Sequence, residues 1–464
     1  MKPTKLGSSV SFIASALAID DLARCRGAEV ITRDIAIIGG GAAGTYAAIN
    51  LKDRGKSVIV VERRGSLGGH TSTYHDPTTG TPINYGVQLH HEDSTTRDFY
   101  ARLNVTAGPG SFPEVKTPLY IDFTDGSPIL NYSIPQPSEN YFQALHKYPY
   151  LENGIELPDP VPEELLLTWP EYMERFNLTN DAIATYSRPA TPGDLTKYLA
   201  LYVFNYLNTV LLEEQVEGKI IVNANGDLSE LYRNALAELD SDVLLNSVVV
   251  SGQRGRKPTD GVKLCVSTPK GKKWIVAKQL VFSAPAVLKN LEPFSLDERE
   301  VNIISEFEGG FYYTGIVTDF GLPTNYSYTN RGQNTEYHIA SVPGVVMFNP
   351  TNVEGTYYYW YNSFSDMTRE QVETDTRNTI KLLQRTVTGA DVSAEPKFPA
   401  FKSHTPLHPI TSADAIRRGI YREVYSLQGY RNTWYTGSLL VPGSSQLWNN
   451  TNQLLPRIIA ASEQ

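Results

Sequence analysis

A glycine-rich turn between an apolar strand and a helix is the feature that most constrains this chain. The run Gly39-Gly40-Gly41-Ala42-Ala43-Gly44 fits the pattern G-x-G-x-x-G. Residues 34–38, just before it, form the kind of apolar, β-branched run that is typical of a buried parallel strand. Residues 42–54 predict a helix with one apolar face, and residues 57–61 predict a second strand. Together they form one βαβ unit.

Each part of this motif has a separate role in binding a dinucleotide. Gly39 permits the tight turn, Gly41 lets the backbone approach a pyrophosphate, and Gly44 lets the helix pack closely on the strand. The helix that begins at Ala42 and Ala43 offers free N–H groups and a positive dipole end to the phosphates. Glu62 ends the second strand, where a carboxylate can accept hydrogen bonds from ribose hydroxyls. The sequence therefore predicts a dinucleotide site.

A second glycine turn favours FAD over NAD as the cofactor. Arg63 and Arg64 follow the ribose acid, and then come Leu67-Gly68-Gly69-His70-Thr71. Two adjacent glycines again permit close backbone approach, which a plain NAD domain does not need at this place. The alternative is a glycine turn that only connects two elements. There is no second G-x-G-x-x-G, so we expect no separate nicotinamide-binding domain. The substrate would then reduce the flavin, and oxygen would reoxidise it.

At these residues the chain resembles the flavin-containing amine oxidase and carotenoid desaturase superfamily. Residues 62–70 are similar to its second signature, and residues 83–88 to the strand that follows. The segment 434–437, then 443–445 and a final helix, is similar to the part that lies against the flavin. The resemblance implies an adenine contact from the backbone of Val248. It also implies cofactor contacts from Gly68, Gly69, His70, Thr71, Gly437, Ser445, Gln446 and Leu447.

Two departures from the amine oxidases argue against amine oxidation. His70 stands where those enzymes usually have Arg, and no C-terminal Cys is present to bond the flavin covalently. The Gly-Gly-His-Thr form is more similar to a fungal and bacterial branch. That branch includes beta-cyclopiazonate dehydrogenase, an oxidative cyclase of indole tetramic acids, and flavin-dependent fatty acid isomerases. Of these, the fungal dehydrogenase type suits the chain better.

The order of predicted elements indicates an α/β cofactor domain interrupted by a different structure, α+β overall. We expect the Rossmann-type FAD-binding domain to combine residues 33–105, 220–295 and 425–464. Residues 106–219 and 296–424 would then form an inserted, mixed substrate domain. Local patterns within these segments predict a long helix within 192–214 and a strand over 243–250.

Three side chains are candidates for the catalytic residue. His70 and Gln88 would lie near the flavin ring by the resemblance. Tyr359 belongs to the aromatic run 356–361, in which Tyr357, Tyr359 and Tyr361 would share one face of a strand. That face could line a substrate cavity, or it could be plain strand packing. Trp434 and Trp448 could border the same cavity. The adjacent residues His90 and His91 would point to opposite faces of a strand, one packed and one solvated.

Three functions fit these observations. The first is an FAD-dependent oxidase or dehydrogenase that takes hydride from a C–N or C–C centre of a small, aromatic or apolar secondary metabolite. The second is a redox-neutral, flavin-dependent isomerase that shifts double bonds in an unsaturated fatty acid. The third is a flavin-binding protein without catalysis.

Charge and cysteine content exclude other classes of site. The formal net charge is −9, and a chain this acidic repels nucleic-acid phosphates. The only two cysteines, Cys25 and Cys265, exclude a disulfide framework and a cysteine-based metal site. We expect Cys265 to be a small apolar residue in a strand. The histidines show no metal-binding pattern, so no metal is expected.

The N-terminus and the glycosylation motifs favour the secretory pathway, with a cytoplasmic location as the alternative. Residues 1–18 have the features of a short signal peptide, and Ala16-Leu17-Ala18 fits a cleavage site. Asn-x-Ser/Thr motifs begin at Asn104, Asn131, Asn177, Asn325 and Asn449. Beyond the N-terminus, no apolar run is long enough to span a bilayer.

Overall fold

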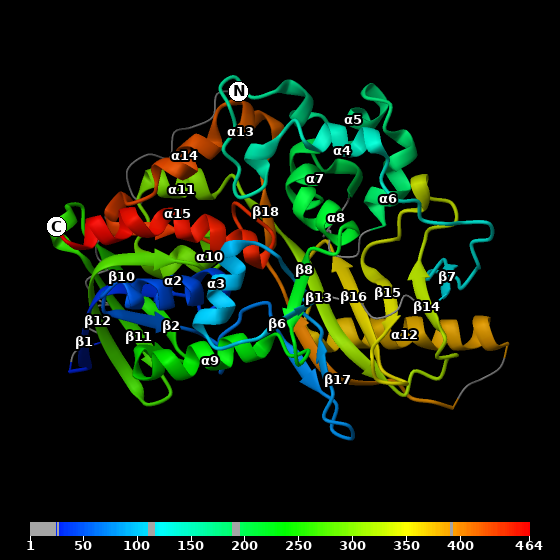
Figure 1. Ribbon diagram of the computed structural model, residues 1–464, viewed down its shortest axis with the longest axis horizontal. Coiled ribbons are helices and arrows are strands. Elements are labelled where there is room, and N and C mark those ends of the chain that lie inside the picture. Colours follow the sequence, from blue (N-terminus) through cyan, green and yellow to red (C-terminus); the bar gives the residue numbers. More distant parts are fainter. Residues whose placement is uncertain (1–24, 26, 110–116, 188–194, 390–392) are drawn as a thin grey trace, which may run out of the picture.

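The computed structural model contains two large sheets, each with helices on its faces (Figure 1). It describes residues 25, 27–109, 117–187, 195–389 and 393–464. The expected signal peptide, residues 1–18, lies outside the described residues.

The first sheet is assembled from three distant stretches of the chain. Its strand order is β10-β11-β12-β1-β2-β9, and β19 also pairs with β12. β1 pairs in parallel with both β2 and β12. Consecutive parallel strands such as β1 and β2 need a crossover connection, which a helix between them supplies. The strands are β1 (Glu29–Ile38), β2 (Val58–Val61), β9 (Val243–Leu244), β10 (Val248–Arg254), β11 (Val262–Thr268), β12 (Gly271–Phe282) and β19 (Thr433–Tyr435). The predicted Rossmann-type domain built from separated segments is confirmed.

Helices α2 (Ala42–Asp53) and α15 (Ser444–Ser462) pack on each other beside this sheet. Eight of the twelve residues of α2 are buried, because α15, α9 (Ser229–Leu239) and the sheet enclose it. α3 (Ser94–Arg102) joins the same layer. Tight packing on the sheet fixes where the first turn of α2 lies, and that turn begins the predicted phosphate site.

The second sheet has the order β17-β13-β16-β15-β14-β7, with β18 paired to β13. α12 (Arg369–Thr388) covers one face, and Tyr357, Tyr359 and Tyr361 pack there in one apolar cluster with its buried side chains. On the other face, Tyr358 and Trp360 pack in one cluster with Ile83. Ile83 belongs to the first domain, which is the part of the molecule built around the first sheet, and the second domain is the part built around the second sheet. The strands are β7 (Thr117–Ile121), β13 (Glu308–Thr318), β14 (Tyr326–Asn330), β15 (Gly344–Pro350), β16 (Tyr357–Ser363), β17 (Lys397–Ser403) and β18 (Leu407–Ile410).

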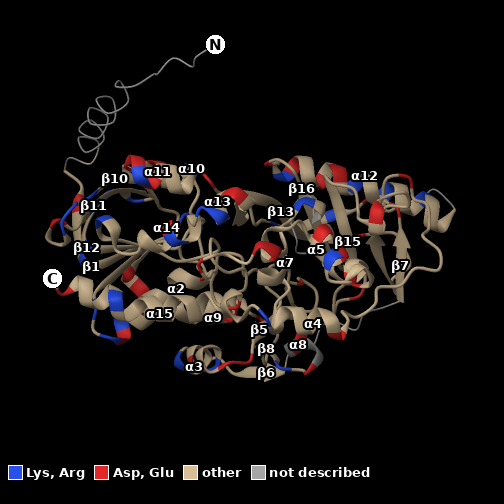
Figure 2. Cartoon of the chain, turned by 90° about the horizontal axis from the view of Figure 1, so that it is seen from above, with Lys and Arg blue, Asp and Glu red and all other residues tan. Residues whose placement is uncertain are grey.

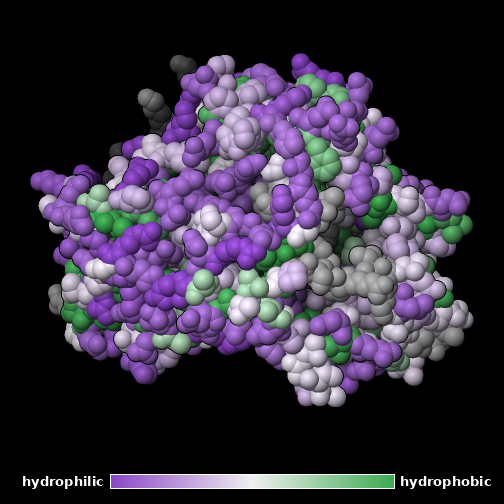
Figure 3. Space-filling view, viewed as in Figure 1, coloured by the Kyte–Doolittle hydropathy of each residue, from purple (hydrophilic) through white to green (hydrophobic). Residues whose placement is uncertain are grey.

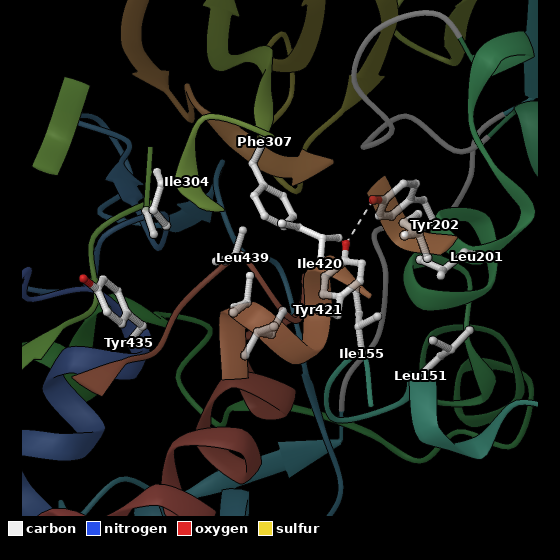
Figure 4. Packing of buried hydrophobic residues seen from close by; sticks show 14 of the residues in the cluster. Leu151, Ile155, Leu201, Tyr202, Ile304, Phe307, Ile420, Tyr421, Tyr435 and Leu439 are labelled. Atoms are coloured by element: carbon white, nitrogen blue, oxygen red, sulfur yellow. Dashed lines mark hydrogen bonds between the residues drawn. The ribbon is translucent and has the colours of Figure 1, made fainter. Parts of the chain in front are cut away.

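A layer of short helices joins the two domains at the top of Figure 1. Figure 4 shows one contact in this core, where the hydroxyl groups of Tyr202 and Tyr421 lie 3.0 Å apart. The helices here are α4 (Glu139–Leu145), α5 (Trp169–Arg175), α6 (Ala182–Tyr186), α7 (Ala200–Tyr206), α8 (Thr209–Val216), α13 (Ala413–Arg417) and α14 (Ile420–Ser426). Smaller elements are β3 (Thr73–His75), β4 (Pro82–Asn84), β5 (His90–His91), β6 (Ala107–Pro109), β8 (Ile220–Asn223), α10 (Leu288–Leu291) and α11 (Glu298–Ile304).

Three local predictions were wrong. The long helix expected within residues 192–214 is broken, because Asn208 accepts a hydrogen bond from Leu211 N and starts a new helix. The strand expected over residues 243–250 is interrupted at Asn246, which has a positive φ of 50°. Neither His90 nor His91 is solvated, since β5 is enclosed by β8 and α15.

Cys25 and Cys265 form a disulfide, which corrects the expectation that Cys265 is only a packing residue. The two residues are 240 positions apart in sequence, with Cα atoms 5.9 Å apart. A single pair at this separation gives no spacing pattern, and only the packing of the chain just before β1 against β11 and β12 brings the two together.

Positively and negatively charged residues are interspersed along the described chain (Figure 2). Within the described part of the chain, no helix has both the length and the apolar character that a membrane span requires. Among the same residues, no group of three or more His, Cys, Asp or Glu side chains could hold a metal ion.

Candidate cofactor and active site

A cavity of about 350 Å³ lies where β1, β2 and β12 end and where α2 and α15 begin. Binding at the carboxyl ends of parallel strands is the rule for open α/β sheets. Most of the cofactor residues predicted from the sequence line it, from segments far apart in the chain. These are Gly39, Gly41, Ala42, Ala43, Glu62, Arg63, Gly68, Gly69, His70, Val248, Gly437 and Leu447.

The first glycine turn has the geometry that its sequence suggests. Gly39 has φ +98°, which favours glycine. A Cβ on Gly44 would lie 2.0 Å from the carbonyl oxygen of Gly39, so only glycine allows this helix to pack so closely on the turn. Gly41 differs from both, since its Cβ would meet nothing nearer than Gly69 Cα at 3.7 Å. Gly41 therefore faces open space at the N-terminus of α2.

The second glycine turn is packed against the first. Gly68 N donates to the carbonyl oxygen of Gly40 at 2.8 Å, and Gly68 and Gly69 both have positive φ. A Cβ on Gly69 would lie 2.8 Å from Gly41 Cα. The two turns thus form one continuous backbone wall of the cavity, and a dinucleotide can approach it without side chains in the way.

Glu62 lies at the end of β2 with its carboxylate buried against this wall. Oε2 accepts a hydrogen bond from Gly40 N and Oε1 accepts one from Arg64 N, each at 2.7 Å. A carboxylate can accept about four hydrogen bonds, so capacity remains for sugar hydroxyls. Glu62 therefore both fixes the first turn and offers acceptors at the adenosine end predicted by the motif.

Positive charge gathers beside the glycine wall. Arg64 donates to the carbonyl oxygens of Gly69 at 2.7 Å and Ser403 at 3.2 Å, so it links the two domains. Burial and the nearby charge of Arg64 lower the pKa of Lys402 to about 8. Arg63 also lines the cavity. These cations, opposed at this place by Glu62, suit a ligand with a negatively charged diphosphate.

The C-terminal segment contributes Gly437, Ser438, Pro442, Ser444 and Leu447 to the lining. Two predicted contacts have other partners instead. Ser445 Oγ accepts a hydrogen bond from His91 N, and Gln446 Nε2 donates to the carbonyl oxygen of Glu152. Thr71 is buried behind the second turn and does not line the cavity.

His70 is the catalytic candidate that the structure places at the cavity. Its ring stacks on that of His404, with centroids 4.3 Å apart and planes nearly parallel. Burial, reinforced by Arg64 and Lys402, lowers the pKa of His70 to about 3. Burial and the neighbouring His70 hold the pKa of His404 well below its ordinary value. Both imidazoles are therefore neutral near pH 7.

The other candidates lie elsewhere. Gln88 donates to the carbonyl oxygen of Asn84 at 3.4 Å, and its neighbour Val87 lines the cavity in its place. Tyr359 is buried under α12, on the face of the second sheet that packs against that helix. Trp434 and Trp448 do not border the cavity, because both are packed in the core of the first domain.

Sequence reasoning missed the contribution of residues 402–408. Thr405 and Leu407 line the cavity from the second domain, and His404 lies against His70. Nε2 of His404 is buried and has no hydrogen-bond partner among the described residues. No motif marks this segment in the sequence, and only the pairing of β17 and β18 with β13 brings it to the first domain.

The fold and this cavity define a dinucleotide-binding oxidoreductase of the flavoprotein type. A family model described as an NAD(P)-binding Rossmann-like domain matches residues 37–103. The FAD-dependent oxidoreductase dbaF of Emericella nidulans is 49% identical over 98% of this chain and 97% of its own length. Beta-cyclopiazonate dehydrogenase of Aspergillus flavus is 31% identical over 93% of this chain and 94% of its own length.

The chain belongs to this family of FAD-dependent oxidoreductases. The predictions of the family, of an enzyme and of FAD as its cofactor are confirmed. Solved structures share the fold. A CLA-producing fatty acid isomerase from P. acnes has a TM-score of 0.70 with 20% identity, over 92% of this chain and 98% of that one. Putrescine oxidase has a TM-score of 0.62 with 14% identity, over 93% and 100%.

Proposed function

We propose that this enzyme removes a hydride from a C–N or C–C centre of a small, aromatic or apolar secondary metabolite and that oxygen then reoxidises its FAD. The observation that carries the proposal is a cavity lined on one side by the two glycine turns and on the other by Thr405 and Leu407 of the second domain. A cavity shared in this way holds the cofactor with one domain and the substrate with the other.

The residues present fit FAD. The space over Gly41 is free of side chains, and the N-terminus of α2 faces that space. Glu62 supplies hydrogen-bond acceptors at the end of β2. When bound, FAD supplies the acceptor for the hydride. The N-terminus of α2 would hold the diphosphate, with the cations of Arg63, Arg64 and Lys402 nearby.

A pair of stacked, neutral imidazoles, His70 and His404, adds hydrogen-bonding groups to the site. A neutral imidazole can donate one hydrogen bond and accept another, and His404 carries a buried Nε2 with no hydrogen-bond partner among the described residues. Its stacking on His70, at the cavity wall, holds the ring in place. The same surroundings that keep both rings neutral disfavour the imidazolium form, so we assign this pair to hydrogen bonding and not to uptake of the proton that leaves the substrate.

The resemblance to curated relatives supports oxidation in particular. One relative is a dehydrogenase by name, and it matches this chain over nearly its whole length. The fatty acid isomerase shares only the fold at 20% identity, so it gives no comparable support for isomerisation.

The test is to purify the holoenzyme, record its flavin spectrum and screen amines, indole compounds and unsaturated fatty acids under anaerobic conditions. We expect at least one amine or indole compound to bleach the flavin, and admission of air to restore the colour with release of peroxide. Conversion of a fatty acid to a product of unchanged mass without peroxide would identify an isomerase instead. A flavin that no compound reduces and no product at all would favour a binding protein.

A further inference from the structure

Two independent features concern the compartment in which this chain folds. The first is the disulfide between Cys25 and Cys265, which uses both cysteines of the chain. Both residues are buried, so the bond belongs to the folded structure. Disulfides of this structural kind form and persist in oxidising compartments such as the endoplasmic reticulum, and they are rare in the cytosol.

The second feature is the position of four glycosylation motifs. Asn104, Asn131, Asn177 and Asn325 are all exposed. Asn104 and Asn177 follow α3 and α5, and Asn325 immediately precedes β14. Asn104, Asn131 and Asn177 have φ between +54° and +56°, which places them in tight turns. Surface turns accommodate an oligosaccharide without loss of packing. The face shown in Figure 3 is largely hydrophilic, as expected for a solvated surface.

The fifth motif is different. Asn449 lies within α15 and is only partly exposed, and its Nδ2 donates to Asp93 Oδ2 at 2.8 Å. An oligosaccharide on Asn449 would break the bond to Asp93 and separate α15 from the cap of α3.

We propose that this chain is a glycoprotein of the secretory pathway, with N-linked oligosaccharides on Asn104, Asn131, Asn177 and Asn325 and none on Asn449. In each transfer, the side-chain amide nitrogen bonds to the first sugar carbon of a lipid-diphosphate-linked oligosaccharide. The bond between that carbon and the diphosphate oxygen breaks, the amide loses one proton, and the lipid diphosphate leaves. The reaction needs no oxidant. The disulfide supports the same compartment independently of the sugar sites.

The experiment is to express the full chain, with its own N-terminus, in yeast and to treat it with peptide N-glycosidase F in ¹⁸O-labelled water. Peptide N-glycosidase F converts each glycosylated Asn to labelled Asp, which peptide mass spectrometry locates. We expect label at the four exposed sites, none at Asn449, and no free thiol in the denatured, unreduced chain. An unlabelled chain with two free thiols would overturn the proposal, and label at Asn449 would overturn the structural selection.

Matched variants separate loss of sugar from loss of folding. Thr106→Ala, Ser133→Ala and Thr179→Ala each remove one motif while keeping the Asn in its left-handed turn. Each is expected to remove one oligosaccharide's mass, and Asn449→Gln is expected to remove none. A variant that keeps its full glycan mass would overturn the assignment of that site. These readouts do not depend on bound FAD or on turnover, so the outcome is separate from that of the proposed function.

Discussion

Gly41 and Gly69 lie back to back, so that a Cβ built on Gly69 would stand 2.8 Å from the Cα of Gly41. The contact joins the two glycine turns into one wall. The reverse relationship is not symmetric, because a Cβ built on Gly41 meets Gly69 Cα only at 3.7 Å. One glycine is therefore required by the protein's own packing, while the other is required only by a ligand.

This asymmetry predicts different effects of two Gly→Ala substitutions. Gly41→Ala should weaken FAD binding at least about tenfold, because its Cβ fills the space over the first turn of α2 that a diphosphate needs. Its φ of −74° allows alanine, so the apoprotein should melt as the wild type does. Fluorescence titration with FAD and thermal melting check the two effects. Gly69→Ala serves as the contrast and should lower both affinity and stability, since it also has φ +56°. Wild-type FAD affinity in Gly41→Ala would show that the diphosphate does not need the space over Gly41.

The cofactor half of the site could be predicted from sequence because it is encoded locally. The turn at Gly39–Gly44, the acid at Glu62 and the pair Gly68–Gly69 all lie within one βαβ unit and the residues just after it. Their spacing fixes their geometry once the strands are parallel. The C-terminal segment could be named only through its resemblance to a superfamily.

The side of the cavity formed by residues 402–408 could not be predicted, because it depends on contacts between distant segments. His404 stacks on His70 across 334 positions (404 − 70), and no sequence periodicity reports such a pair. The same reason applies to Tyr359, since alternation gives two faces of a strand but not which face a helix covers. The disulfide, with a separation of 240, also depends on the register of distant strands.

A buried ion pair links β10 of the first sheet to α11. Arg254 donates to both carboxylate oxygens of Glu300 at 2.6 and 2.7 Å, and Arg431 and Tyr435 contact the same carboxylate. Glu300→Gln leaves two guanidinium groups without their anion and should cost about 3–5 kcal/mol of unfolding free energy. Urea unfolding followed by circular dichroism measures this. Glu163→Gln is the matched control, because its pair with Arg417 is exposed and should leave stability unchanged. Equal stability of both variants would contradict the role assigned to the network.

His90 should make stability depend on pH. Burial lowers its pKa from 6.5 to about 3, and its Nδ1 lies 2.7 Å from the Tyr100 hydroxyl. Between these two values the unfolded chain binds a proton that the folded chain does not, so stability falls as the pH falls below 6.5. The loss from this residue at pH 5 should be about 2 kcal/mol. Unfolding of wild type and His90→Gln at pH 7 and pH 5 tests it, because the variant should lose less on acidification. A slope unchanged by His90→Gln would show that other groups set the pH dependence.

The disulfide should stabilise the chain by restricting the unfolded state. It ties the segment before β1 to β11 across a sequence separation of 240 residues. Removing the bond therefore raises the conformational entropy of the unfolded chain. Cys25→Ser should lower the free energy of unfolding by about 2–4 kcal/mol. The variant should show one free thiol after denaturation where the wild type shows none. The double variant Cys25→Ser with Cys265→Ala should be about as stable as the single one, because the second substitution removes no further bond and buries no polar group. FAD content should stay at the wild-type level in both, since neither cysteine lines the cavity. If reduction of the wild type leaves its melting temperature unchanged, the cross-link does not contribute to stability.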